Sequence, residues 1–279
     1  MADEDNQNPT TIVDTRTSSK VQVANVNRQT KGAAAAPFGI KPVLADPFEN
    51  KRLKLKGLKD FYIAAASEAR VIEVLKAIRD KGGKVTSSGG QRDLNASVTP
   101  ARGKGSLHYP GIALDLYMYS GMIDTDRDQY IVTVDPQTDG SIKTWTVFCK
   151  TEDASTPEIT LQAQVMVNIA RPAGVSSDEI RQPCRLLPPK EVTGRFLNVT
   201  ELFLAGGFTR ISAKEGFTKD PKCRDYEAAE WWHFQDENDL VVGVTTLRQA
   251  LLRVYTSKQI ESSKLKDSVD AVWNGKVFA

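Results

Sequence analysis

The sequence predicts an α+β fold in which antiparallel strands pack beside a few helices. Apolar residues recur at helical spacing after residue 67 and again after residue 246. Between these segments, residues 112–170 contain several stretches in which apolar and polar residues alternate, as is typical of strands. Helices that bracket hairpins, instead of alternating with single strands, favour α+β over a parallel α/β sheet.

The first predicted element is a helix that begins after Ser67, a residue type favoured at N-caps. Its apolar side chains share one face: Val71, Val74, Leu75 and Ile78. Gly82 and Gly83 end it. A short strand over residues 85–88 is expected next, leading into the turn Gly89-Gly90-Gln91-Arg92.

A second strand is predicted after Pro110. One face carries the apolar residues Ile112, Leu114, Leu116 and Met118. Ala113 and Asp115 alternate with them and lie on the opposite face. We expect the apolar face to pack on the core and the other face to present Asp115.

The middle of the chain has the pattern of a β-rich segment. Residues 130–134 and 143–148 read as two strands of a hairpin, because turn-forming residues fill positions 135–140. A longer strand is predicted over residues 159–169. Residues 171–195 are rich in Pro and Gly and are expected to form a loop.

The last third predicts short helices and strands in alternation. Thr200 is expected to cap a helix over residues 201–205, and residues 208–211 and 231–234 read as strands. Behind Thr246, one helical stripe comprises Leu247, Ala250, Leu251 and Val254. A further helix is predicted from Leu265, Val269 and Val272.

The composition of the 279-residue chain excludes several functional classes. Lys and Arg number 37 and Asp and Glu 35, so the net charge of +2 predicts no nucleic-acid or anionic-membrane surface. No apolar stretch is long enough to predict a membrane span. The polar first residues lack the apolar stretch of a secretory signal, so synthesis in the cytoplasm is expected. Three widely spaced cysteines fit neither a disulfide framework nor a Cys-x-x-Cys metal site.

The chain is predicted to have two parts. Residues 1–50 are rich in Asn, Gln, Thr, Ser, Ala and Pro and show no sustained periodicity, so they are expected to form a polar arm that is flexible or partner-bound. Residues 51–279 are expected to form one domain, because they contain the predicted elements.

The candidate chemistry centres on the only two histidines of the chain, His108 and His233. Together with Asp115 they offer two imidazoles and a carboxylate, and a catalytic zinc usually has three protein ligands. Glu230 stands three residues before His233, where it is a candidate to take a proton from metal-activated water. A single His or Asp is more often structural. The coincidence of both histidines with acidic neighbours favours the functional interpretation.

These residues also carry a family resemblance. It rests on two motifs, Ser106-x-His108-x-x-Gly111-x-Ala113-x-Asp115 and Glu230-x-Trp232-His233. In this order they resemble the zinc D-Ala-D-Ala peptidases, a group that includes dipeptidases, carboxypeptidases and the L-alanyl-D-glutamate endopeptidases of phage endolysins. The resemblance covers roughly residues 60–120 and 196–240. It implies the fold shared with the hedgehog signalling domain, an antiparallel sheet with flanking helices.

The resemblance implies a role for each motif residue. His108, Asp115 and His233 would bind one zinc ion per chain. Glu230 would act as general base and then as general acid. Arg92 would hold the substrate carbonyl or the developing oxyanion, although a surface salt bridge with Asp93 is the alternative.

Two further residues have substrate-binding roles with open alternatives. Ser106 would hydrogen-bond the substrate, or it would only cap its loop. Trp232 would border the cleft, although a tryptophan in a strand is most often a core residue.

This chain also departs from the family pattern. The turn from Ser88 to Arg92 is at least one residue longer than the usual spacing, which weakens the assignment of Arg92. The stretch between Asp115 and Glu230 is far longer than compact members need. Residues of about 120–195 are therefore predicted to be a β-rich insertion that walls the cleft, binds glycan or docks onto another protein.

The predicted function is zinc-dependent hydrolysis of an amide bond in peptidoglycan stem peptides, by an endopeptidase or a D-Ala-D-Ala carboxypeptidase. A phage endolysin or a virion-associated hydrolase acting at the bacterial cell wall is expected, with other virion or assembly proteins as partners of the arm and the insertion. One alternative is a structural or adaptor component of a phage tail or injection machine. Another is a cytosolic dipeptidase, which would need a small closed pocket.

Overall fold

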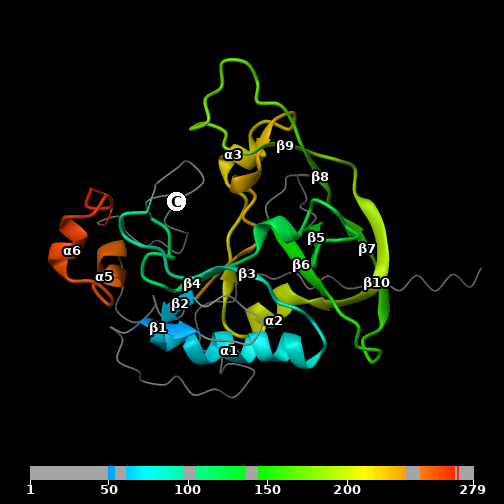
Figure 1. Ribbon diagram of the computed structural model, residues 1–279, viewed down its shortest axis with the longest axis horizontal. Helices are drawn as coiled ribbons and strands as arrows, with labels where there is room; N and C mark the ends of the chain where they lie inside the picture. The colour runs from blue at the N-terminus through cyan, green and yellow to red at the C-terminus, as the bar shows by residue number, and fades with distance from the viewer. Residues whose placement is uncertain are drawn as a thin grey trace, which may run out of the picture. The chain divides into compact units, whose positions relative to one another are not determined.

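The computed structural model describes residues 50–53, 61–96, 105–135, 144–236, 246–267 and 269. All of them belong to one compact unit, residues 35–279 (Figure 1). Helices and antiparallel sheets occur together, which confirms the α+β class. In the described part of the chain, no helix has the length and apolar character needed to cross a membrane. The predicted arm lies outside the described residues, apart from Asn50.

One four-stranded sheet, here called the central sheet, is antiparallel and joins segments far apart in the sequence. Its strands in spatial order are β11 (Thr209–Arg210), β13 (His233–Gln235), β4 (Ala113–Leu116) and β3 (Ser87–Gly89). The three strands predicted at 85–88, after Pro110 and at 231–234 are therefore neighbours, although each is shorter than expected. Both faces of β4 pack on protein, because Ala113, Leu114 and Leu116 are all buried.

A two-stranded ribbon and a long helix support this sheet. β1 (Asn50–Leu53) pairs with β2 (Phe61–Ala64), and α1 (Ala65–Asp80) follows directly. The predicted apolar face of α1 is buried. The predicted cap is wrong, because the helix begins at Ala65 and the Ser67 hydroxyl donates a 2.7 Å hydrogen bond to Asp236 instead.

The β-rich segment contributes most strands of two further antiparallel sheets. One contains β5 (Tyr130–Val134), β6 (Trp145–Lys150), β10 (Lys190–Asn198) and β7 (Glu158–Ala163) in that order. The other contains β12 (Arg224–Asp225), β9 (Pro183–Leu186) and β8 (Met166–Asn168). The predicted hairpin is confirmed as β5 and β6, with residues 136–143 of its connection outside the described residues.

Two predictions for this segment are wrong. Residues 159–169 do not form one strand, because the chain leaves one sheet after Ala163 and enters the other at Met166. Between them the buried Gln164 side chain donates to the carbonyls of Val165 and Leu187. Residues 171–195 are not a continuous loop either, since β9 and most of β10 fall there. Many residues of β9 and β10 are polar and exposed, so these strands show no clear apolar alternation in the sequence.

The short helix predicted at 201–205 exists as α2 (Val199–Ala205), but its cap differs. Asn198 accepts the hydrogen bond from the Glu201 backbone N–H at 3.1 Å. Thr200 is buried, and its hydroxyl accepts from the Val147 N–H instead. Three short helices between β4 and β13 were not predicted: η1 (Met118–Ser120), α3 (Glu215–Thr218) and η2 (Tyr226–Ala228).

The C-terminal helices follow the prediction in part. α5 (Leu247–Leu251) begins at Thr246, which forms a capping box with Gln249. The helix predicted around Leu265 is wrong, since the next helix is α6 (Ser257–Glu261) and residues 264–267 are turns. Leu265 and Val269 are nevertheless buried, so their spacing reflects packing on α5. Val272 lies outside the described residues.

Two apolar clusters hold the sheet from opposite sides. The larger one contains side chains of α1, of the central sheet and of the β-rich segment, among them Val74, Leu114, Trp145 and Trp231. The smaller one joins the loop before β4 to the C-terminal helices, through Leu107, Tyr109, Leu247 and Leu251. Burial on this scale gives order to the loop that carries His108, because its flanking residues are core residues.

Candidate metal centre

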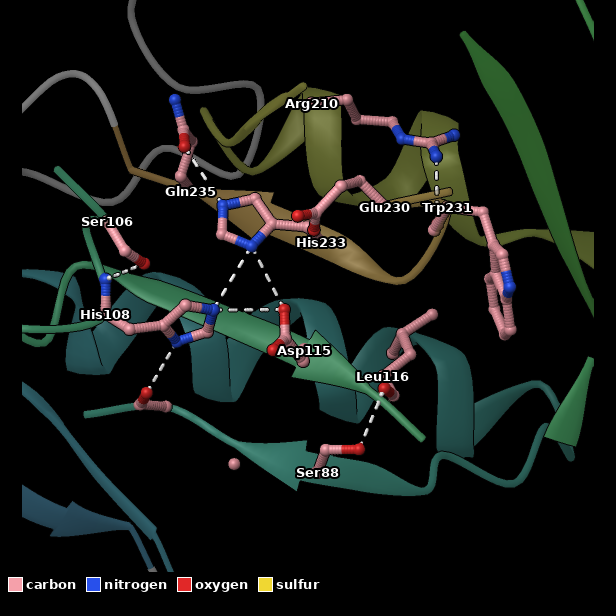
Figure 2. A network of polar contacts seen from close by, with 12 residues as sticks. Ser88, Ser106, His108, Asp115, Leu116, Arg210, Glu230, Trp231, His233 and Gln235 are labelled. Carbon is pink, nitrogen blue, oxygen red and sulfur yellow. Dashed lines mark hydrogen bonds and ion pairs between the residues drawn. The ribbon is translucent and has the colours of Figure 1, made fainter. Parts of the chain in front are cut away.

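The two long-range motifs of the sequence meet on neighbouring strands. Asp115 on β4 and His233 on β13 are register partners in the antiparallel pair, so their side chains lie side by side on one face. His108 comes from the turn that precedes β4 (Figure 2). The prediction that these three side chains lie together is confirmed.

The distances within this cluster fit coordination of one metal ion. His108 Nε2 and His233 Nδ1 lie 3.1 and 3.0 Å from Asp115 Oδ1, and 3.2 Å from each other. Ligand atoms at ~2.1 Å from a tetrahedral metal are separated by ~3.4 Å. A few tenths of an ångström of outward movement would admit the ion. Imidazole and carboxylate together suit first-row transition metals better than Mg²⁺ or Ca²⁺.

Hydrogen bonds on the far side of each imidazole assign the protons. His108 Nδ1–H donates to the Gly90 carbonyl at 2.6 Å, and His233 Nε2–H donates to Gln235 Oε1 at 3.0 Å. The two nitrogens that face Asp115, His108 Nε2 and His233 Nδ1, therefore present lone pairs to it. Three acceptor atoms converge with no donor among them, an arrangement that calls for a cation.

Gly90 is required for the first of these bonds. A Cβ on Gly90 would lie 2.5 Å from the Tyr62 carbonyl oxygen and 2.9 Å from the Phe61 ring. Strand β2 thus packs directly against the Gly90 backbone, and the Gly90 carbonyl accepts the hydrogen bond from His108. Only glycine allows this approach.

Electrostatics also favour positive charge in the cluster. Burial acts to raise the pKa of Asp115, but the two imidazoles, His108 foremost, lower it well below the usual range. Burial acts to lower the pKa of His233, and Asp115 outweighs this, so that its pKa is raised. The cluster therefore favours positive charge between its three ligand atoms.

Glu230 is held beside the cluster by an unusual backbone conformation. Its φ is +55°, a left-handed value that is uncommon for a residue other than glycine. In Figure 2 its side chain runs alongside that of His233. The carboxylate is 8% exposed and pairs with the Lys214 ammonium, with Glu230 Oε1 2.5 Å from Nζ.

The turn that carries Glu230 is fixed from two sides. The Trp145 indole N–H donates to the Ala229 carbonyl at 2.7 Å. Arg210, which is partly buried, donates from Nη2 to the Trp231 carbonyl at 2.9 Å. Strain at a functional residue is typical where the surroundings are rigid enough to maintain it.

The other predicted site residues do not join the cluster directly. The Arg92 guanidinium lies over the Tyr109 ring, 5.6 Å from its centroid, and its backbone N–H donates to the His108 carbonyl. Ser106 Oγ accepts from the His108 N–H at 3.4 Å, which is the loop-capping alternative. Trp232 is 5% exposed and packs edge-on against Trp231, in the core. Substrate contacts of these three residues stay predictions.

Three residues around the site were missed from the sequence. Gln235 had a signal, because it lies two residues after His233 and strand alternation places both on one face. Gly90 and Lys214 had none, since their roles depend on a carbonyl and an ammonium brought in from other elements.

No protein-family model, curated protein or solved structure matches this chain. The chemistry of the site and the two motifs are therefore what indicate a function.

Gln235→Leu should weaken binding of a divalent transition metal by about 10- to 100-fold, because the His233 ring loses the acceptor that fixes its orientation. Competitive titration of the protein with zinc measures this. Gln235→Glu keeps an acceptor at the same reach and should retain the affinity. Equal affinity of Gln235→Leu and the unmodified protein would show that the Gln235 contact does not orient the ligand.

Proposed function

We propose that this protein is a zinc metallopeptidase that hydrolyses an amide bond in peptidoglycan stem peptides, with the fold of the D-Ala-D-Ala peptidases and the hedgehog domain. The observation that carries the proposal is the convergence of three unprotonated ligand atoms beside one buried carboxylate that is not a ligand. This is the constellation that the motif resemblance implies. A phage endolysin or a virion-associated hydrolase is the proposed biological setting.

The proposed metal is zinc, one ion per chain, held by His108 Nε2, Asp115 Oδ1 and His233 Nδ1. Three protein ligands are the usual number in catalytic zinc sites, whereas structural sites have four. When bound, zinc polarises the scissile carbonyl and brings the pKa of a coordinated water near neutrality.

Glu230 supplies the proton transfers in this proposal. Its carboxylate accepts the proton of the attacking water and later delivers it to the leaving amine. Lys214 and the left-handed turn keep the carboxylate in one place, which limits the reorganisation needed during reaction.

Arg92 is the proposed stabiliser of charge that develops on the carbonyl oxygen. Its backbone is tied to the His108 carbonyl, so the residue is anchored at the edge of the metal cluster. The guanidinium would move from the Tyr109 ring to the oxyanion when substrate binds.

The acid groups at the site favour amide over glycosidic cleavage. Glycosidases use two opposed carboxylates, one as acid and one as base or nucleophile. Here Asp115 is engaged between two imidazoles, which leaves Glu230 as the carboxylate for proton transfer. One base beside a Lewis acid is suited to acyl transfer.

The test is digestion of purified peptidoglycan by the zinc-loaded protein. New free amino groups should appear without new reducing ends, and mass spectrometry of the fragments identifies the bond. A chelator should abolish the activity and added zinc should restore it. New reducing ends would contradict the proposal. The absence of products on walls from several hosts would favour the structural adaptor instead.

A further inference from the structure

Lys214 is a second basic residue at the site, on the side of Glu230. Its side chain is 28% exposed, whereas the Glu230 carboxylate that it contacts is 8% exposed. The ion pair thus joins a buried carboxylate to a partly exposed ammonium.

The backbone fixes this pair on both sides. The Lys214 N–H donates to the Ala228 carbonyl at 2.9 Å, two residues before Glu230. The Lys214 carbonyl accepts from the Phe217 N–H at the start of α3. Phe217 itself is fully buried against Trp145. The backbone of Lys214 is therefore fixed beside the turn that carries Glu230, within reach of its carboxylate.

We propose that Lys214 binds the C-terminal carboxylate of the substrate, so that the enzyme is a carboxypeptidase. This inference rests on the proposed function and chooses between its two forms. Glu230 must deliver a proton to the leaving nitrogen, so it lies on the leaving-group side of the scissile bond. A cation in contact with Glu230 lies on that side too.

The chemistry of the leaving group distinguishes a carboxypeptidase from an endopeptidase. In a peptide with a free C-terminus, the leaving nitrogen and the carboxylate of the released residue are joined through one Cα. Their N–Cα and Cα–C bonds are about 1.5 Å each, so the two groups fall within one small region beside Glu230 and Lys214. At an internal bond, a neutral amide carbonyl would occupy the same place.

Charge balance strengthens the argument. A substrate carboxylate brought next to ionised Glu230 would meet like-charge repulsion in a partly desolvated site. An ammonium between the two carboxylates removes this repulsion. Lysine suits the role, since it is a compact charge whose attraction to a second carboxylate needs no fixed fork geometry. An internal amide creates no repulsion of this kind.

The test compares ligands that differ only in the C-terminal charge. Zinc-loaded full-length protein is given N-acetyl-D-Ala-D-Ala and its C-terminal amide, and kcat/KM is measured for each. D-alanine and D-alaninamide, the corresponding product-side ligands, are titrated by NMR for their Kd. The free acid should be preferred over the amide by about tenfold in both measurements, as for one charge-assisted contact.

Three variants distinguish the role of Lys214 from general effects. Lys214→Met should abolish the preference for the acid, and Lys214→Arg should restore most of it. Lys219→Met is the matched control, since Lys219 pairs with Glu215 on the exposed side of the same helix. It should behave as the unmodified protein. Zinc content should stay the same in all three.

Several outcomes overturn the inference. Equal losses for acid and amide in Lys214→Met would show that Lys214 acts only through Glu230. Cleavage of internal bonds with no preference for a free carboxylate would make the enzyme an endopeptidase. If no peptide is hydrolysed, the proposed function fails, while a D-alanine preference that depends on Lys214 would still support carboxylate binding.

Discussion

His233→Ala should purify without zinc, and His108→Ala should do the same. The unmodified protein should contain about one zinc per chain, as three ligands on one ion imply. Each substitution removes one of the three ligand atoms, and no other histidine exists in the chain to replace it. Elemental analysis of the purified proteins measures the effect, and hydrolysis of peptidoglycan should disappear with the metal.

The matched control is Tyr119→Ala, since Tyr119 is exposed and follows the strand that carries Asp115. This variant should keep its zinc. Circular dichroism of all the variants separates metal loss from unfolding. Full zinc retention in both histidine variants would exclude the assigned ligand set.

Glu230→Gln should keep its zinc and lose turnover by about 10²–10⁴-fold, the usual range when a general acid–base group is removed. Glutamine preserves the size of the side chain but accepts no proton at neutral pH. The ion pair with Lys214 is lost, yet the Lys214 side chain is partly exposed and remains hydrated, so the fold should persist. Steady-state kinetics on stem peptides and zinc analysis of the same sample measure both effects.

Glu215→Gln is the control for this variant. Glu215 also pairs with a lysine, Lys219 at 3.3 Å, but both side chains are highly exposed. Loss of such a pair should leave turnover unchanged. If Glu230→Gln loses the metal instead, Glu230 belongs to the ligand set. An unchanged rate would remove it from the mechanism.

The candidate ligands were predictable because local pattern and motif agreed. Alternation after Pro110 placed Asp115 on a strand, and residues 231–234 read as a second strand. The structure pairs these strands with His233 opposite Asp115. The hydrogen bonds that assign the imidazole protons were not predictable, since one acceptor is a backbone carbonyl and shows no residue signature.

Helix starts were predicted less well, for a related reason. Ser67 and Thr200 are both good capping residues, but each uses its hydroxyl in a tertiary hydrogen bond. Competition between local and long-range partners is invisible in the sequence. The β-rich character of residues 120–195 was predictable from the alternation of apolar and polar residues and from the turn residues between the stretches. Its division into two sheets was not, because pairing depends on contacts between distant segments.

Trp145 belongs to the β-rich segment, and its indole N–H donates to the Ala229 carbonyl next to Glu230, while its ring packs on Phe217, three residues after Lys214. The β-rich segment and the turn that carries Glu230 are therefore packed together, and we expect them to open together. Amide hydrogens around Glu230 should exchange with solvent only when the whole core opens. A shortened protein that lacks residues of about 120–195 would lose the contact that supports the Glu230 turn, so the β-rich segment is a structural part of the candidate site.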